Sequence, residues 1–80
     1  MTMSETFSVY QFFDDDSWER VRHSVTAEEA VKAAYHYCHS AAARIGITRK
    51  VIITDNGDMT CFEWQYGEGV VFPKKADNAN

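Results

Sequence analysis

The stretch Thr26–Gly46, TAEEAVKAAYHYCHSAAARIG, decides the fold because it predicts one amphipathic helix. Thr26 and Glu29 stand in the order of a capping box, so we expect the helix to begin at about Ala27. Gly46 stands where a left-handed helix end is favoured. The apolar positions between these ends follow the three-four spacing of a single stripe: Ala27, Ala30, Val31, Ala34, Cys38, Ala41, Ala42 and Ile45. So many alanines predict a helix that packs closely on a sheet.

Two runs that are typical of strands precede this helix. FSVYQFF (7–13) and WERVRHSV (18–25) are rich in aromatic and β-branched residues, and the polar turn between them predicts a hairpin with a three-residue loop at 14–16. Because strand side chains alternate between faces, this register defines two faces. The face expected to be core carries Phe7, Val9, Phe13, Val21 and Val25. The opposite face carries Tyr10, Phe12, Trp18, Arg20 and Arg22.

A second hairpin follows the helix. ITRKVIIT (47–54) and MTCFEWQY (59–66) flank DNGD, and Asn-Gly between two strands is typical of a two-residue type I′ turn. The register that follows pairs Thr54 with Met59 and Lys50 with Glu63. It places Val51, Ile53, Phe62 and Trp64 on one face and Ile52, Met59 and Cys61 on the other. Two glycines then predict a bend before a short apolar segment, 70–72, that Pro73 ends.

These elements predict an α+β chain of order ββαββ, with an antiparallel sheet of about four strands and one helix packed on one face. We expect a single domain over 1–80, ordered from about 7 to 73, with flexible tails at 1–6 and 74–80. One helix does not cover both faces of such a sheet. The outer face is therefore either an exposed interaction surface or is covered by segment 70–72 folding back across it.

Composition narrows the classes of function. The chain has 80 residues, 45% of them hydrophobic, and a net charge of -4, which disfavours binding to duplex nucleic acid. No run approaches the roughly 18–20 apolar residues of a membrane span, and the N-terminus lacks the layout of a secretory signal. We therefore expect a cytoplasmic protein that makes no membrane contact. In that compartment Cys38 and Cys61 are expected to be reduced and buried.

The residues that could carry chemistry form no complete motif. His36 and His39 could share a metal ion, but Cys38 belongs to the apolar stripe, a third ligand would have to come from His23 or a distant acid, and the spacing matches no zinc pattern. A calcium loop that begins at Asp14 would need a glycine and a glutamate where Glu19 and Val25 stand. No glycine-rich phosphate loop precedes a helix, and a one-helix core leaves little room for a pocket. We expect no metal, no cofactor and no enzyme activity.

An aromatic and cationic surface is the sharpest feature. It comprises Tyr10, Phe12, Trp18, Arg20, Arg22, Ile52 and Met59. Aromatic residues and arginine are enriched at the centres of protein interfaces, so a protein partner or a homodimer is the favoured interpretation. Stacking of single-stranded nucleic acid on the same side chains is the alternative, and the net charge and the neighbouring Asp14-Asp15-Asp16 disfavour it.

The stretches YQFFDDDSWERVRHSVTAEEAVKAA, AARIGITRKVIITDNGD and FEWQYGEGVVFP resemble a group of small bacterial proteins of unassigned function. The resemblance spans about residues 10–73. It implies a short, free-standing bacterial protein, and it carries no catalytic or binding residues over to this chain.

Overall fold

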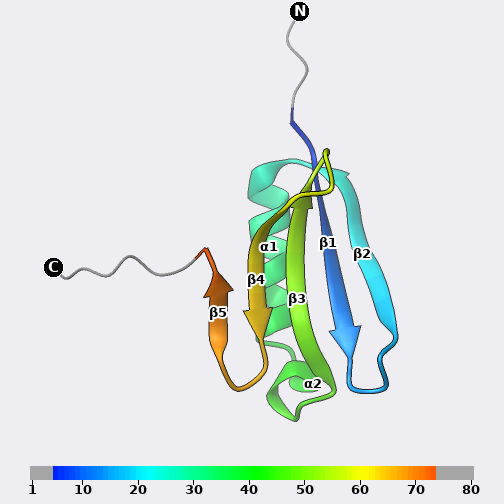
Figure 1. Cartoon of the computed structure of the whole chain (residues 1–80), viewed down its shortest axis with the longest axis vertical. Helices are drawn as coiled ribbons and strands as arrows, with labels where there is room; N and C mark the ends of the chain where they lie inside the picture. The colour runs from blue at the N-terminus through cyan, green and yellow to red at the C-terminus, as the bar shows by residue number, and fades with distance from the viewer. Residues whose placement is uncertain (1–4, 74–80) are drawn as a thin grey trace, which may run out of the picture.

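A computed structural model describes residues 5–73 of the chain. The elements follow in the order β1 (Phe7–Phe13), β2 (Trp18–Val25), α1 (Ala27–Cys38), α2 (Ala41–Arg44), β3 (Thr48–Asp55), β4 (Thr60–Gln65) and β5 (Gly69–Phe72) (Figure 1). The predicted α+β class and ββαββ order are confirmed. The predicted flexible tails lie, apart from residues 5 and 6, outside the described residues.

The sheet has five antiparallel strands in the order β2-β1-β3-β4-β5. The fifth strand exceeds the predicted number because segment 69–72 pairs with β4 instead of folding back across the sheet. The pairing of β1 with β3 joins the two hairpins at the centre, where Val9 lies opposite Ile53 and Gln11 opposite Val51. Figure 1 shows the sheet facing the viewer with α1 behind it, so one face of the sheet carries α1 and the other carries no described helix.

The first hairpin has the predicted three-residue loop. The Phe13 N–H donates to the Ser17 carbonyl oxygen at 2.8 Å, and Asp16 takes a left-handed φ of 71° that closes the loop. Farther from the loop the register shifts, because Tyr10 lies opposite Arg20 whereas Val9 lies opposite Arg22. This β-bulge adds one residue to β2 and changes which face the following side chains reach.

The second hairpin has a three-residue loop at 56–58 in place of the predicted two-residue turn. The Asp55 N–H donates to the Met59 carbonyl oxygen at 2.9 Å, and Asp58 takes a φ of 62°. The Asp55 side chain explains the difference, because its Oδ1 accepts from the backbone N–H groups of Gly57 at 2.8 Å and Met59 at 3.0 Å. Such a side-chain turn outcompetes the type I′ conformation that Asn-Gly favours.

The longer loop and a bulge after it change the pairing of β3 with β4. Ile52 lies opposite Glu63, and Lys50 lies opposite Gln65, so the predicted Thr54–Met59 and Lys50–Glu63 pairs are wrong. The prediction that Val51, Ile53, Phe62 and Trp64 share one face is confirmed. Val51 lies opposite Trp64 and Ile53 lies opposite Phe62, and residues directly opposite in an antiparallel pair share a face.

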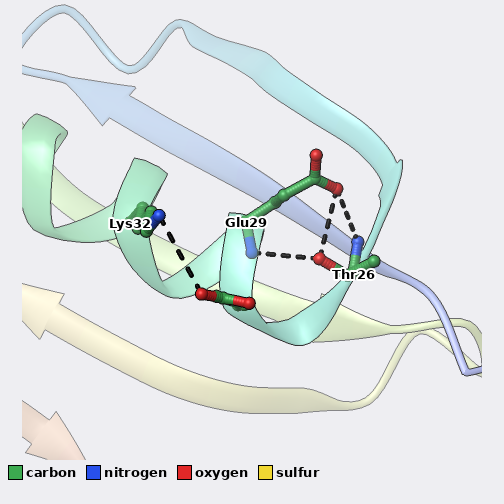
Figure 2. A network of polar contacts seen from close by, with 4 residues as sticks. Thr26, Glu29 and Lys32 are labelled. Atoms are coloured by element: carbon green, nitrogen blue, oxygen red, sulfur yellow. Dashed lines mark hydrogen bonds and ion pairs between the residues drawn. The ribbon is translucent and has the colours of Figure 1, made fainter.

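The helix begins where the capping box predicts (Figure 2). The Glu29 N–H donates to Thr26 Oγ1 at 3.1 Å, and the Thr26 N–H donates to Glu29 Oε1 at 3.0 Å. These two bonds satisfy backbone donors that have no partner within the helix. One turn farther on, Lys32 forms an exposed ion pair with Glu28 at 3.9 Å.

The prediction of a single helix up to Gly46 is wrong, because the first helix ends at Cys38 and a second helix begins at Ala41. Ser40 has an extended conformation, and its Oγ accepts from the Ala43 N–H at 3.1 Å and donates to the Tyr37 carbonyl oxygen at 3.1 Å. Ser40 therefore ends one helix and caps the next. Gly46, with a φ of 87°, ends α2 as expected of a left-handed position.

The core lies between α1 and the centre of the sheet. Alanines 30, 33 and 34 of α1 pack against Val9, Val51 and Ile53, all of them buried. Near α2, the buried Thr48 hydroxyl donates to Gln11 Oε1 at 3.0 Å, and Gln11 Nε2 donates to Glu19 Oε1 at 3.2 Å. This buried pair joins β1 to β3 by side chains as well as by backbone.

Both cysteines are free. Cys38 is buried in the apolar stripe as predicted, whereas Cys61 is exposed, which corrects the expectation that both are buried. Burial raises the pKa of the Cys38 thiol to about 11. None of the helices within residues 5–73 is long and apolar enough to span a membrane.

Candidate functional site

The outer sheet face, meaning the face opposite α1, presents an exposed aromatic cluster. Trp18 is 60% exposed although it contacts two other rings. Its ring centroid lies 5.7 Å from that of Tyr10, edge-on at 60°, and 6.5 Å from that of Phe12. Edge-to-face and tilted ring contacts of this kind hold aromatic side chains in place without covering them. The cluster is therefore an ordered apolar surface in contact with solvent.

A shallow depression of about 310 Å³ runs beside this cluster. Tyr10, Phe12, Trp18 and Ile52 line it, so the fold brings together four of the seven residues of the predicted surface. Its polar rim is made by Thr54, Asp58 and Thr60, at the end nearer the β3–β4 loop. An apolar centre with a polar rim is the usual anatomy of a protein interface.

Two cations flank the apolar centre. Arg20 lies directly opposite Tyr10 in the β1–β2 pair, and residues directly opposite in an antiparallel pair share a face. Lys50 places its Nζ 4.6 Å from the centroid of the Phe12 ring, within the range of a cation–π contact. The position of Arg20 agrees with the sequence-based prediction. Lys50 was missed, because the wrong β3–β4 register paired that residue with Glu63.

Arg22 does not belong to the outer face. The β2 bulge places it opposite Val9, and its guanidinium lies 5.9 Å from the ring centroid of Tyr37 on α1. It lines a depression on the helix side together with Glu29 and Lys32. The alternation of side chains predicted the opposite face, since an ideal strand contains no extra residue.

Met59 and Cys61 also lie elsewhere. Met59 is 67% exposed at the end of the 56–58 loop, and it does not line the aromatic depression. Cys61 lies on the helix side, where its thiol contacts the Ile53 carbonyl oxygen at 3.4 Å and it lines a depression with Ala30. The bulge opposite Ile53 and Thr54 explains why Cys61 lies on the helix side instead of the predicted outer face.

The structure also contains an apolar groove that the sequence analysis missed, between α1 and strands β3 to β5. It consists of two adjoining depressions of about 190 and 280 Å³ that share Val31, Ile53 and Phe62. Tyr35 and Val70 form part of its rim and are exposed. The segment 69–72 was the available signal for this groove. As a fifth strand, it makes the sheet wider than one helix of ~10 Å diameter can cover.

The histidines of α1 are arranged as ordinary surface side chains. The ring nitrogen Nδ1 of His39 lies 2.8 Å from the Tyr35 carbonyl oxygen, and the His36 ring packs edge-on against Tyr37. Among residues 5–73 no group of three or more His, Cys, Asp or Glu side chains could hold a metal ion.

Comparisons with protein-family models, with curated proteins and with solved structures find no match to this chain.

Proposed function

We propose that this chain acts by protein association, and specifically that it forms a homodimer through its outer sheet face. One observation carries the proposal: Trp18, the largest apolar side chain on that face, is held by Tyr10 and Phe12 while 60% of it remains exposed. Large aromatic side chains that are ordered before binding lose little conformational entropy in an interface. Exposed ordered aromatics are therefore favourable anchors for a partner.

The charges of the outer face support a partner that is a second copy. Asp58 lies at the loop that follows β3, Lys50 lies near the start of β3, and Ile52 lies between them on the same face. A twofold axis passing near Ile52 would bring Asp58 of one copy close to Lys50 of the other, twice. Self-complementarity of this kind is what an isologous dimer requires.

Single-stranded nucleic acid is the less favoured occupant of the same face. Stacking would use the rings of Tyr10, Phe12 and Trp18, and the backbone would follow cations. Arg22 lies on the helix side, so the outer face has only one of the two arginines expected on it. Asp58 adds a negative charge to the aromatic depression. Protein contact explains the aromatic cluster without a basic surround.

The fluorescence of Trp18 tests the proposal. In a Trp64→Phe variant, Trp18 is the one remaining tryptophan of the chain. We expect its emission to shift to shorter wavelength, and its quenching by iodide to fall, as the protein concentration rises from about 1 µM to about 1 mM. Emission that does not change over this range would refute association through this face.

Addition of a single-stranded oligonucleotide at low salt separates the two occupants. If nucleic acid is the true occupant, the oligonucleotide quenches Trp18 at low protein concentration, and Arg20→Glu abolishes the effect. If the outer face is a dimer contact, the oligonucleotide leaves the emission of Trp18 unchanged.

A further inference from the structure

Another cavity, which shares Phe12 with the aromatic depression, lies over the start of β3. This is the end of the sheet where α2 is found (Figure 1). It is open to solvent, with a volume of about 470 Å³, and its charged residues Asp14, Asp16 and Arg49 are exposed. The β1–β2 loop forms one wall with Asp14 and Asp16, and β3 contributes Arg49 and Lys50. The remaining lining comes from Phe12, Phe13, Gln65 and Tyr66.

Charges of both signs line this cavity without pairing to each other. Among residues 5–73 the one ion pair joins Lys32 to Glu28 on α1, and neither residue lines this cavity. The acids at 14 and 16 and the cations at 49 and 50 therefore keep their capacity for charged hydrogen bonds. A ligand that offers one group of each sign would satisfy both sets at once.

Both cations are positioned by neighbouring groups. The Arg49 guanidinium lies 4.7 Å from the centroid of the Tyr66 ring, and its Nη1 donates to the Gly46 carbonyl oxygen at 3.4 Å. The Lys50 ammonium lies 4.6 Å from the centroid of the Phe12 ring. These contacts reduce the side-chain entropy that binding an anion would otherwise cost.

The acidic wall is fixed by the backbone. The Asp14 N–H donates to the Ile47 carbonyl oxygen at 2.9 Å, which ties the β1–β2 loop to the chain just before β3. The Asp16 N–H donates to the Phe13 carbonyl oxygen at 3.1 Å inside the loop. Since the loop continues β1 and the cations lie on the neighbouring strand, acids and cations are separated by about one to two strand spacings, roughly 5–10 Å.

We propose that this cavity binds a small zwitterion, a molecule with a carboxylate and an ammonium group joined by a short apolar linker. Arg49 and Lys50 bind the carboxylate, and Asp14 and Asp16 bind the ammonium group. The separation of the two sets favours ω-amino acids of about four to six carbons over glycine, whose charges are closer together. One copy of the chain supplies every group of this site, and two of its residues, Lys50 and Phe12, also belong to the outer sheet face.

The test uses 6-aminohexanoate as the probe and the amide resonances of the ¹⁵N-labelled full chain as the readout. Saturable shifts are expected at residues 14, 16, 49, 50 and 66, with a dissociation constant on the order of 1 mM. Hexanoate and hexylamine, which each carry one of the two charges, are expected to bind at least about tenfold more weakly, and so is glycine. The absence of saturable shifts up to about 50 mM would overturn the proposal. Binding of hexanoate or hexylamine as tight as that of 6-aminohexanoate would also overturn it.

Two variants test the assigned roles. Arg49→Gln and Asp16→Asn are each expected to weaken binding about tenfold. Asn is the suitable replacement at 16 because it tolerates the left-handed conformation of that residue. Their matched controls, Arg44→Gln on α2 and Glu28→Gln on α1, change the net charge equally but lie outside the cavity, and they are expected to leave the affinity unchanged. Equal weakening by the controls would show a nonspecific charge effect and overturn the assignment.

Discussion

The Trp18 indole meets the Tyr10 ring edge-on, with 5.7 Å between the ring centroids and 60° between the ring planes. The two residues lie on different strands of the first hairpin, where Tyr10 pairs with Arg20 and Phe12 with Trp18. Their contact fixes Trp18 in place and leaves most of its surface exposed. This relationship makes Trp18 the proposed anchor of the interface.

Truncation of Trp18 is the first prediction. If Trp18 anchors the dimer, Trp18→Ala raises the dimer dissociation constant by about 30-fold or more, as for a typical interface hot spot. The control is Met59→Ala, which removes a similarly exposed apolar side chain outside the aromatic depression. Concentration-dependent light scattering on both variants gives the comparison. An equal effect of the two substitutions would argue against an anchor at Trp18.

The capping box gives a second prediction. Thr26→Ala removes the side-chain acceptor of the Glu29 N–H, so the free energy of unfolding falls by about 1 kcal/mol. Thr26→Ser retains a hydroxyl at the same position and is expected to change stability by less than half as much. Urea denaturation followed by circular dichroism measures both. A Thr26→Ala variant as stable as the parent chain would show that the first turn of α1 does not need this cap.

The buried pair of Thr48 and Gln11 gives a third. Thr48→Val keeps the volume of the side chain and removes the hydroxyl that donates to Gln11 Oε1 at 3.0 Å. Because the amide oxygen is then left buried without its donor, we expect a loss of about 1–3 kcal/mol in the free energy of unfolding. Adding Gln11→Leu to that variant should recover part of the loss, since both polar partners are then gone. A double variant no more stable than Thr48→Val would mean that the hydrogen bond is not the source of the cost.

Cys38 gives a prediction about pH. Burial raises the pKa of its thiol from the ordinary 9.0 to about 11, so between these values the folded chain keeps a proton that the unfolded chain loses. The contribution of Cys38 to stability is therefore complete below pH 9 and is lost as the pH rises to about 11. We expect the urea midpoint of the parent chain to fall more steeply over pH 9–11 than that of Cys38→Ala. Cys61→Ala, which removes the exposed thiol, should keep most of the steep fall of the urea midpoint with pH. Parallel plots of urea midpoint against pH for all three proteins would contradict this reasoning.

The parts of the fold that depend on local chemistry could be predicted from the sequence. The Thr26–Glu29 box acts within one helical turn, and the loop at 14–16 follows from the polar run between two aromatic runs. The break at Ser40 also had a local signal, since serine is a favoured N-cap, but the surrounding alanines continue the helical pattern on both sides.

The outer face could be predicted only in part because a β-bulge has no reliable local signal. One extra residue in a strand moves the side chains that follow it to the other face, until a second irregularity compensates for it. Arg22 follows the bulge in β2, and Cys61 is itself the extra residue of the bulge in β4; both lie on the helix side. Tyr10, Phe12, Trp18 and Ile52 precede or avoid the bulges and share the predicted face. The opposed charges at the start of β3 were missed for a related reason: Asp14 and Arg49 come together only through the β1–β3 pairing.

Sedimentation equilibrium of the unmodified chain, from about 1 µM to about 1 mM, tests the proposed dimer most directly. The chain has a mass of 9.1 kDa, so association through the outer face predicts a weight-average mass that rises toward twice this value, and a rise that Trp18→Ala suppresses. A mass that stays at 9.1 kDa over the whole range would refute the homodimer.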